Sequence, residues 1–442
     1  MQRRALLAGT AALALACPRP GRAQGRPEIQ FWYGLGGALS EVVQAQVRRF
    51  NESQDRVAVV ASFKGSYVDT MTGAIAAWRA GAPPHIAQVF EVGTATMMAA
   101  GPAIRPVHQL AEETKVELDP AQYLPGVRGY YSDTQGRLVS MPHNSSSAVM
   151  WLNLDAFAKA GLSTTELPQT WEALREAARK LKAANATEMP MTTAWPSWVL
   201  FEQMAAIHDV PLATKENGFA GLDAQLELTS DFFRRHTDFI LGLQKEGLFH
   251  YAGRDNAGDP LFPGGKAAIS FNSSAGRARV VKEAQFKWAS LPLPWHEGLA
   301  SPKNGVIGGA SLWVLTARNR TPDEYHGVAE FFRFISRPEQ DLWWHQQTGY
   351  VPITRGGYEA AQQAGYYAQN PGADAAIIQL SRAEPTPNSK GFRLGGFVEI
   401  RNIIQEELEK AFQGQQGAAQ LLENADRRGD AVLRNFERAN RA

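Results

Sequence analysis

The sequence predicts an α/β fold in which two lobes, joined by a hinge, enclose a cleft. Apolar runs alternate with segments of helical period from residue 28 to residue 90, and the same alternation returns from residue 149. The chain has 442 residues, enough for two domains, and its 44% hydrophobic and 20% charged content is that of an ordinary globular protein. Ligands of open α/β sheets bind beyond the carboxyl ends of strands, so we expect a site there.

The first unit is predicted from a regular alternation of strands and helices. Val43, Val47 and Phe50 recur at helical spacing, and the apolar runs on either side are rich in strand-forming residues. The order is strand 28–33, helix 41–50, strand 57–63, helix 68–79 and strand 85–90. A β-α-β-α-β order predicts a mostly parallel sheet with helices on both faces.

The second unit and the C-terminal third follow the same rules. Thr170 is a helix-capping signal, and the predicted order is strand 149–152, helix 170–183, strand 189–193 and strand 267–271. Further helices are predicted at 330–335, 340–347, 403–412 and 418–438. Apolar stripes such as Ile404, Leu408 and Phe412 indicate packing faces of these helices.

Residues 1–23 have the pattern of a secretory signal peptide. Arg3 and Arg4 precede an uncharged apolar run at 5–16, and a small residue, Ala23, offers a cleavage site. The run is too short to span about 30 Å of hydrocarbon, which argues against a transmembrane anchor. The sequence therefore predicts an exported, periplasmic protein. The arginine pair is compatible with export by the twin-arginine route as well as by the general secretory (Sec) route.

The single cysteine, Cys17, lies inside this segment. Cleavage after Ala23 would remove it, whereas cleavage before it would leave a lipid anchor on its sulfur, and both alternatives stay open. Removal of residues 1–23 takes away four arginines and no acid, leaving 41 basic against 44 acidic residues, a net charge of −3. Such a chain has no electrostatic reason to bind nucleic acid.

Motifs of known chemistry are missing from the sequence. The nine histidines have no metal-binding spacing, and there is neither a Gly-x-Ser-x-Gly elbow nor a P-loop. Gly34-Leu35-Gly36-Gly37 follows a predicted strand but lacks the spacing of a dinucleotide site. The sequence predicts no catalytic residue, no metal and no cofactor, and so a binding protein and not an enzyme.

Two polar segments that border predicted strands are predicted as loops. The cluster 144–147 (NSSS) comes directly before one, and 272–274 (NSS) directly after another. Their hydroxyl groups suit an anion or a polyol, although capping or turn sequences look the same. Trp195 and Trp198, separated by Pro-Ser, could cover the carbon skeleton of a polyol or anchor a core, whereas Trp343 and Trp344 indicate packing.

Seven segments carry a resemblance to a known family across nearly the whole chain after residue 23. They are 63–67 (FKGSY), 88–98 (QVFEVGTATMM), 129–133 (GYYSD), 307–313 (IGGASLW), 348–354 (TGYVPIT), 370–374 (NPGAD) and 391–395 (GFRLG). In this order they resemble the periplasmic sn-glycerol-3-phosphate-binding proteins of ABC importers. That family belongs to the extracellular solute-binding proteins of family 1, which include the maltose-binding type.

The resemblance implies a periplasmic binding protein fold of type II. Its two α/β lobes would be residues 24–139 plus 308–349 and residues 140–307 plus 350–442. The chain would cross between them near Ser140, Gly308 and Tyr350.

The resemblance also implies a set of ligand-binding residues at matching positions. These are Tyr67, Glu91, Ser146, Trp195, Trp198, Ser273, Gly309, Tyr350 and Arg401. Arg401 is expected to neutralise a phosphate, so that Arg401→Ala would weaken binding at least about tenfold. Glu91 is expected at the far end, on the glycerol hydroxyls. The match at the second serine cluster is loose by one residue, so Ser274 is an alternative to Ser273.

The implied function is capture of sn-glycerol-3-phosphate, and of glycerophosphodiesters such as glycerophosphocholine, for delivery to a membrane permease. A sugar- or polyol-binding protein of the same fold is one alternative, and a secreted phosphodiesterase is another.

Overall fold

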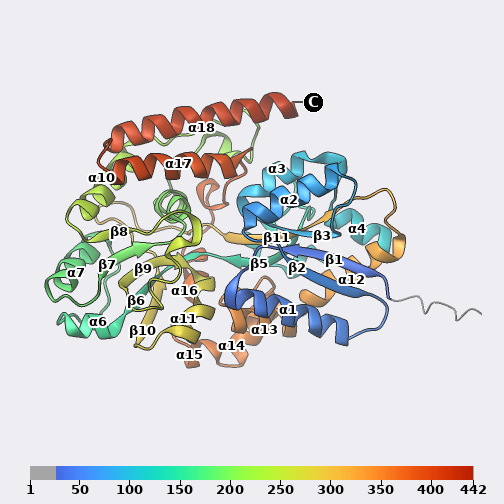
Figure 1. The fold of residues 1–442 in the computed structure, drawn as a ribbon, viewed down its shortest axis with the longest axis horizontal. Coiled ribbons are helices and arrows are strands. Elements are labelled where there is room, and N and C mark those ends of the chain that lie inside the picture. Colours follow the sequence, from blue (N-terminus) through green and yellow to red (C-terminus); the bar gives the residue numbers. More distant parts are fainter. Residues whose placement is uncertain (1–25, 442) are drawn as a thin grey trace, which may run out of the picture.

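Two mixed β-sheets organise residues 26–441, the part of the chain that the computed structural model describes (Figure 1). The signal peptide predicted at residues 1–23, with Cys17, falls outside these residues. Each sheet and its helices form one lobe, and the two lobes lie side by side. The predicted α/β class is confirmed.

The sheet of the first lobe has the order β2-β1-β3-β11-β4, with β5 also paired to β11. Its strands are β1 (Glu28–Tyr33), β2 (Ala58–Phe63), β3 (Ile86–Phe90), β4 (Ile104–Arg105), β5 (Met141–Ser146) and β11 (Gly308–Leu315). β1 runs parallel to β2 and β3, whereas β11 runs antiparallel to β3, β4 and β5. The expected mostly parallel sheet is therefore wrong for half of this lobe, because β11 returns from a distant part of the chain.

The sheet of the second lobe has the order β10-β6-β9-β7-β8. Its strands are β6 (Ala148–Asn153), β7 (Met189–Thr193), β8 (Phe249–Tyr251), β9 (Ala267–Ser273) and β10 (Trp288–Pro292). β7 runs parallel to β8 and β9, and β6 runs antiparallel to β9 and β10. Parallel and antiparallel halves thus meet in this sheet as they do in the first.

Helices cover the sheets. Those of the first lobe include α1 (Gly37–Glu52), α2 (Tyr67–Arg79), α3 (Thr94–Ala99), α4 (Val107–Thr114), α5 (Pro125–Tyr130), α12 (Pro322–Ile335), α13 (Pro338–Thr348) and α14 (Arg355–Gln363). Those of the second include α6 (Leu154–Lys159), α7 (Trp171–Ala183), α8 (Met204–Ile207), α9 (Thr214–Asn217), α10 (Asp231–Lys245), α11 (Arg277–Glu283), α16 (Ala375–Leu380), α17 (Phe397–Phe412) and α18 (Ala418–Asn440), with α15 (Tyr366–Gln369) between the lobes in sequence. α1 packs with α12 and α13 in the first lobe, and α17 and α18 pack as a pair on the second lobe (Figure 1).

The polar cluster 144–147 differs from its prediction as a loop. Residues 144–146 form the end of β5 and are buried, because β5 pairs with β11 along the middle of the first lobe. One residue later the chain enters β6 of the second sheet. Ser147 is therefore the residue at which the chain passes from one sheet to the other.

A network of buried amides holds this crossing. Gln379 Nε2 donates to Ser147 Oγ at 2.8 Å and to the Ala148 carbonyl at 2.7 Å, while its Oε1 accepts from the Leu293 amide at 2.7 Å. Gln203 Nε2 donates to the Val306 carbonyl at 2.9 Å. Neutral side chains thus satisfy the backbone groups that two passing segments leave without strand partners.

The substitution Gln379→Ala tests this network. It leaves the Leu293 amide and the Ala148 carbonyl buried without this partner, and each such group costs about 1–3 kcal/mol. We expect the free energy of unfolding to fall by about 2–5 kcal/mol in denaturant titrations. Gln362→Ala, at an exposed position of α14, is the control and should change it by less than about 0.5 kcal/mol. Equal effects of the two substitutions would contradict the role of the network.

Candidate functional site

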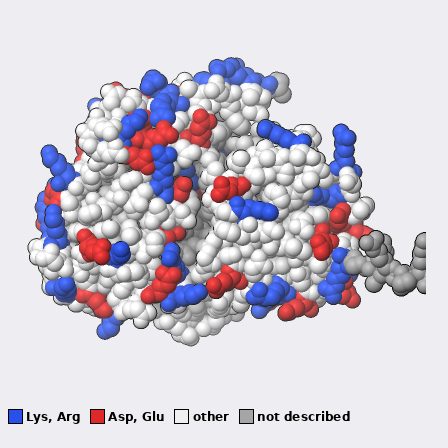
Figure 2. Space-filling model, in the orientation of Figure 1, with Lys and Arg blue, Asp and Glu red and all other residues white. Residues whose placement is uncertain are grey.

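A cavity of about 390 Å³ lies between the two lobes. The space-filling view shows the molecule hollowed along the boundary of the lobes (Figure 2). Both lobes line the cavity, the first with the start of α1, α2 and β11, the second with the end of β9, α11 and α17. All the residues predicted for the site line it: Tyr67, Glu91, Ser146, Trp195, Trp198, Ser273, Gly309, Tyr350 and Arg401.

Two tyrosine hydroxyls meet on one wall of the cavity. Tyr67 Oη accepts from Asn144 Nδ2 at 2.8 Å and lies 3.3 Å from Tyr350 Oη. The Ser66 and Asp69 capping box fixes the first turn of α2 and thus the position of Tyr67. Burial raises the pKa of Tyr67 well above its usual value and that of Tyr350 to about 12. Both phenols therefore keep their protons at neutral pH and can donate to a ligand.

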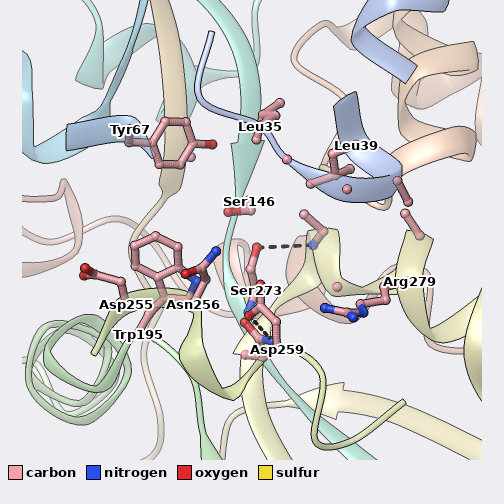
Figure 3. Close-up of a pocket in the computed structure, with 18 of the residues that line it drawn as sticks. Leu35, Leu39, Tyr67, Ser146, Trp195, Asp255, Asn256, Asp259, Ser273 and Arg279 are labelled. Carbon is pink, nitrogen blue, oxygen red and sulfur yellow. Dashed lines mark hydrogen bonds between the residues drawn. The ribbon is translucent and has the colours of Figure 1, made fainter. Parts of the chain in front are cut away.

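Two serines end strands at the middle of the cavity (Figure 3). Ser146 is the last residue of β5, and Ser273 is the last residue of β9. Ser273 Oγ accepts from the Ala275 amide at 3.2 Å, which leaves its proton free for a ligand. Ser273 lines the cavity, whereas the alternative, Ser274, does not. The cluster 272–274, predicted to follow its strand, instead starts inside it, since β9 runs to Ser273.

Gly309 has a conformation and surroundings that only glycine fits. Its φ is +94°, and a Cβ there would lie 1.8 Å from the Asn144 carbonyl oxygen. The start of β11 can therefore run directly against β5 while its backbone faces the cavity.

Trp195 and Trp198 are positioned by two different backbone features. Trp195 has a φ of +51°, unusual for a bulky residue, and its amide donates to the Asp255 carbonyl at 2.6 Å. Trp198, 5% exposed, begins the π-helix η4 (Trp198–Gln203). Strained backbone and π-helical turns both concentrate at functional sites. The indole of Trp195 lies across the cavity from Ser146 and below Tyr67 (Figure 3).

Arg401 forms a buried ion cluster with two glutamates. Its Nε and Nη2 bind the two carboxylate oxygens of Glu202 at 2.6 and 2.7 Å, and Nη2 also binds Glu91 Oε1 at 2.6 Å. Glu91 follows β3 of the first lobe, whereas Arg401 and Glu202 belong to α17 and η4 of the second. The Glu91–Arg401 contact therefore joins the lobes across the cavity.

This cluster corrects the predicted geometry. Glu91 was expected at the far end of the ligand from Arg401, and that prediction is wrong because the two side chains are in direct contact. Burial opposes the charge of Arg401, but the two carboxylates outweigh it and raise its pKa. Burial raises the pKa of Glu91, against the lowering effect of Arg401. Two carboxylates therefore share one guanidinium at this end of the cavity, which makes it rich in hydrogen-bond acceptors.

Several residues at the site were not predicted from the sequence. Glu202 stands with Gln203 inside an otherwise apolar run, WVLFEQMAAI, and two buried polar residues in such a run were the available signal. Asp259 lines the cavity beside Ser273, accepts from Asn272 Nδ2 at 2.9 Å and gave no such signal. Burial raises its pKa to about 6. The uncapped first turn of α1 also lines the cavity and presents free backbone amides.

Residues 26–441 hold no group of three or more histidine, cysteine or acidic side chains arranged to bind a metal ion. None of their helices combines the length and hydropathy that crossing a membrane requires.

Comparisons with known proteins agree with one another. Residues 45–375 match the family described as bacterial extracellular solute-binding protein. The sn-glycerol-3-phosphate-binding periplasmic protein UgpB of Rhizobium meliloti is 40% identical over 412 residues, 93% of this chain and 95% of the relative. UgpB of Yersinia pseudotuberculosis is 39% identical over 431 residues, 97% of each chain.

Solved structures share the fold. UgpB from Mycobacterium tuberculosis in complex with glycerophosphocholine has a TM-score of 0.76 at 19% identity, with 93% of this chain and all of that chain covered. Maltose-bound MalE3 of T. maritima has a TM-score of 0.74 at 16% identity, with 92% and 99% covered. The fold is that of the type II periplasmic binding proteins.

Arg401→Ala should unfold more easily than the wild type. The substitution leaves the carboxylates of Glu91 and Glu202 buried without their cation, and breaking a buried pair costs about 3–5 kcal/mol. Denaturant titration of the ligand-free protein measures this loss. Arg179→Ala, which breaks exposed ion pairs with Glu176 and Glu246, is the control and should leave stability close to that of the wild type. An Arg401→Ala protein as stable as this control would show that the ion cluster does not stabilise the fold.

Proposed function

The chain belongs to the bacterial extracellular solute-binding proteins, and from this premise we propose that it captures sn-glycerol-3-phosphate and glycerophosphodiesters for an ABC importer. It acts outside the cytoplasm, in the periplasm, and hands its ligand to the permease subunits in the membrane. The observation that carries the proposal is a cavity between two lobes with an acidic end and a separate hydroxyl-rich part. The UgpB relatives at about 40% identity support this choice of ligand.

The charges give the ligand one direction. Glu91 can accept hydrogen bonds from two glycerol hydroxyls, and Arg401 Nη1, which makes no hydrogen bond to the described residues, can donate to them. A phosphate placed here would face Glu91 and Asp255. We therefore assign this end to the glycerol and not, as the sequence suggested, to the phosphate.

The phosphate is assigned to the hydroxyl-rich part of the cavity. Its donors are the side chains of Tyr67, Ser146, Ser273 and Tyr350 and the Gly309 backbone. The first turn of α1 adds backbone amides and the positive end of a 16-residue helix. Neutral donors and a helix end can bind an anion without a salt bridge, provided that no carboxylate competes. The indoles of Trp195 and Trp198 then cover the carbon atoms.

A ligand held in this way contacts both lobes. Glu91 and Tyr67 belong to the first, and Ser273, Trp195 and Arg401 to the second. Binding would therefore favour the closed arrangement, which a permease can distinguish from the open one by shape. We propose lobes close to the expected 24–139 plus 308–349 and 140–307 plus 350–442, with two changes. β5 (Met141–Ser146) joins the first lobe because it pairs with β11, and α14 joins it because it packs on α13.

Space beyond the phosphate supports diesters as ligands. We call the part of the cavity around Asp259 and Arg279, on the side of Ser273 away from Trp195, its outer part (Figure 3). Trp151 and Phe262 also line the cavity. Arg279 is paired with Glu283, Nε to Oε2 at 2.9 Å, whereas Asp259 keeps only an amide partner. A carboxylate beside two aromatic rings suits a cationic substituent such as choline.

Capture without turnover is the activity we propose. In a phosphodiesterase, a nucleophile would stand beside a base. The cavity hydroxyls of Tyr67 and Ser273 instead contact a phenol, a carboxamide and a backbone amide. A neutral sugar or polyol remains the alternative ligand, since proteins of this fold include a maltose-bound one.

Calorimetric titration of residues 24–442 tests the ligand class. Glycerol-3-phosphate and glycerophosphocholine should bind saturably, and maltose should not. Ser273→Ala and Tyr350→Phe each remove a donor to a charged group and should weaken binding of glycerol-3-phosphate about 10- to 100-fold.

Ser274→Ala is the matched control, because Ser274 is buried next to Ser273 but does not line the cavity. It should leave the affinity within about twofold of the wild type. Saturable maltose binding, with both glycerol phosphates silent, would replace this proposal with the sugar-binding alternative. Steady release of choline or phosphate would indicate an enzyme.

The pH dependence of binding tests the outer part of the cavity. Asp259, with its pKa near 6, is largely neutral at pH 5 and ionised at pH 7.5. Glycerophosphocholine should therefore bind more tightly as the pH rises, because its cation meets a carboxylate. Glycerophosphoglycerol has a neutral substituent, and its charge is constant over this range. Its affinity should therefore stay the same or fall as the pH rises. Asp259→Asn should flatten both profiles, and parallel profiles for the two diesters in the wild type would exclude this role.

A further inference from the structure

Glu202 is a buried carboxylate that does not line the cavity but controls a residue that does. It is 1% exposed, and both of its oxygens are bound by the guanidinium of Arg401. Bidentate pairing fixes the plane of the guanidinium and uses most of its donors. Only one edge of Arg401 remains for Glu91 and the ligand.

The position of Glu202 follows from η4. This π-helix begins at Trp198, which lines the cavity, and ends at Gln203, which binds the Val306 carbonyl at the crossing between the lobes. A π-helical turn is wider than an α-helical one, so that residues four and five apart lie near one face. Trp198, Glu202 and Gln203 are thereby all directed inward, behind or into the site.

Acidic side chains outnumber the single cation around Arg401. Glu91 and Glu202 are both bound to it, and Asp255 lines the same part of the cavity. One cation therefore faces three carboxylates. A ligand group placed there meets an acceptor-rich surface, which attracts hydroxyl protons and repels an anion.

We propose that Glu202 is a specificity-determining positioning residue that makes the site reject phosphate esters with a second anionic group. This inference rests on the proposed function and refines it. By neutralising Arg401, Glu202 keeps the glycerol end selective for a neutral polyol. The class excluded comprises phosphorylated hydroxy acids such as 3-phosphoglycerate, in which a carboxylate replaces the primary hydroxyl of glycerol-3-phosphate.

The test compares two ligands on two proteins by calorimetry. Wild-type protein should bind glycerol-3-phosphate and prefer it to 3-phosphoglycerate by at least about 100-fold, as expected when a buried charge lacks a partner. Glu202→Gln removes one of the carboxylates that compensate Arg401 while keeping the size of the side chain. The preference should then shrink by at least tenfold, through tighter binding of the acid. A preference that is unchanged in Glu202→Gln would overturn the proposal.

Glu407→Gln is the matched control for this variant. Glu407 lies on α17 with Arg401, is 1% exposed, and pairs with Lys410 at 2.7 Å and Arg428 at 2.6 Å, but it does not line the cavity. It should lower stability without moving the ratio of the two affinities. If both variants change the ratio equally, the effect is one of stability and the assignment to Glu202 is wrong.

A wild-type measurement decides the matter even if Glu202→Gln does not fold. The methyl ester of 3-phosphoglycerate removes the second charge and nearly keeps the shape, so it should bind at least tenfold more tightly than the acid. Equal binding of acid and glycerol-3-phosphate would overturn the proposal. If neither glycerol-3-phosphate nor glycerophosphocholine binds, the proposed function fails instead, and the two failures are thus distinguished.

Discussion

The arrangement of the whole molecule depends on one buried guanidinium. Arg401 lies where the two lobes meet, and its charge is compensated by one glutamate from each side, Glu91 and Glu202. A charge in such a place costs several kcal/mol unless its partners are held accurately. The end of β3 and the π-helix η4 supply that accuracy from different sheets. The arrangement described is therefore the one in which both partners of this charge are in contact, and the cavity lies between the lobes beside them.

At the crossing between the lobes, neutral side chains and not charged ones hold the segments together. Gln203 and Gln379 satisfy the backbone with amides, and the cavity hydroxyls are likewise uncharged. Formal charge is thus concentrated at the two ends of the cavity, at the Arg401 cluster and at Asp259. The part between them, where we place the phosphate, is rich in donors, and Asp259 borders it beside Ser273. An anion can be held there by many weak donors in place of one strong one.

The sequence predicted the local elements well because hydrophobic period is a local property. The strand 28–33, the strand 189–193 and the helix start at Thr170 agree with the structure. Sheet direction was predicted poorly, because β11 comes from residues 308–315 and its pairing with β3 cannot be inferred from spacing. Strand propensity predicts a loop for the polar run 144–147, because a buried strand of asparagine and serine contradicts that propensity. Its partners across the chain make it stable.

The same distinction applies to the site. Family resemblance named residues that do line one cavity, but their roles depend on neighbours that only the fold brings together. Glu91 and Arg401 are 310 positions apart in the chain, and no sequence pattern indicates that they touch. Glu202 lies in an apolar run that reads as core. In the sequence, Arg401 is the most obvious cation for a phosphate, whereas in the structure two glutamates already compensate its charge.

The π-helix η4 has a consequence for how the protein could change its ligand over evolutionary time. One rigid turn carries an aromatic wall of the cavity, the partner of its arginine and a clamp on the crossing segment. A substitution that reshapes this turn to admit a new solute also alters how freely the lobes move. Recognition and motion are thus inherited together at η4, whereas Asp259 belongs to a different segment, at the end of η5 (Asp255–Gly258), and is bonded to Asn272 of β9.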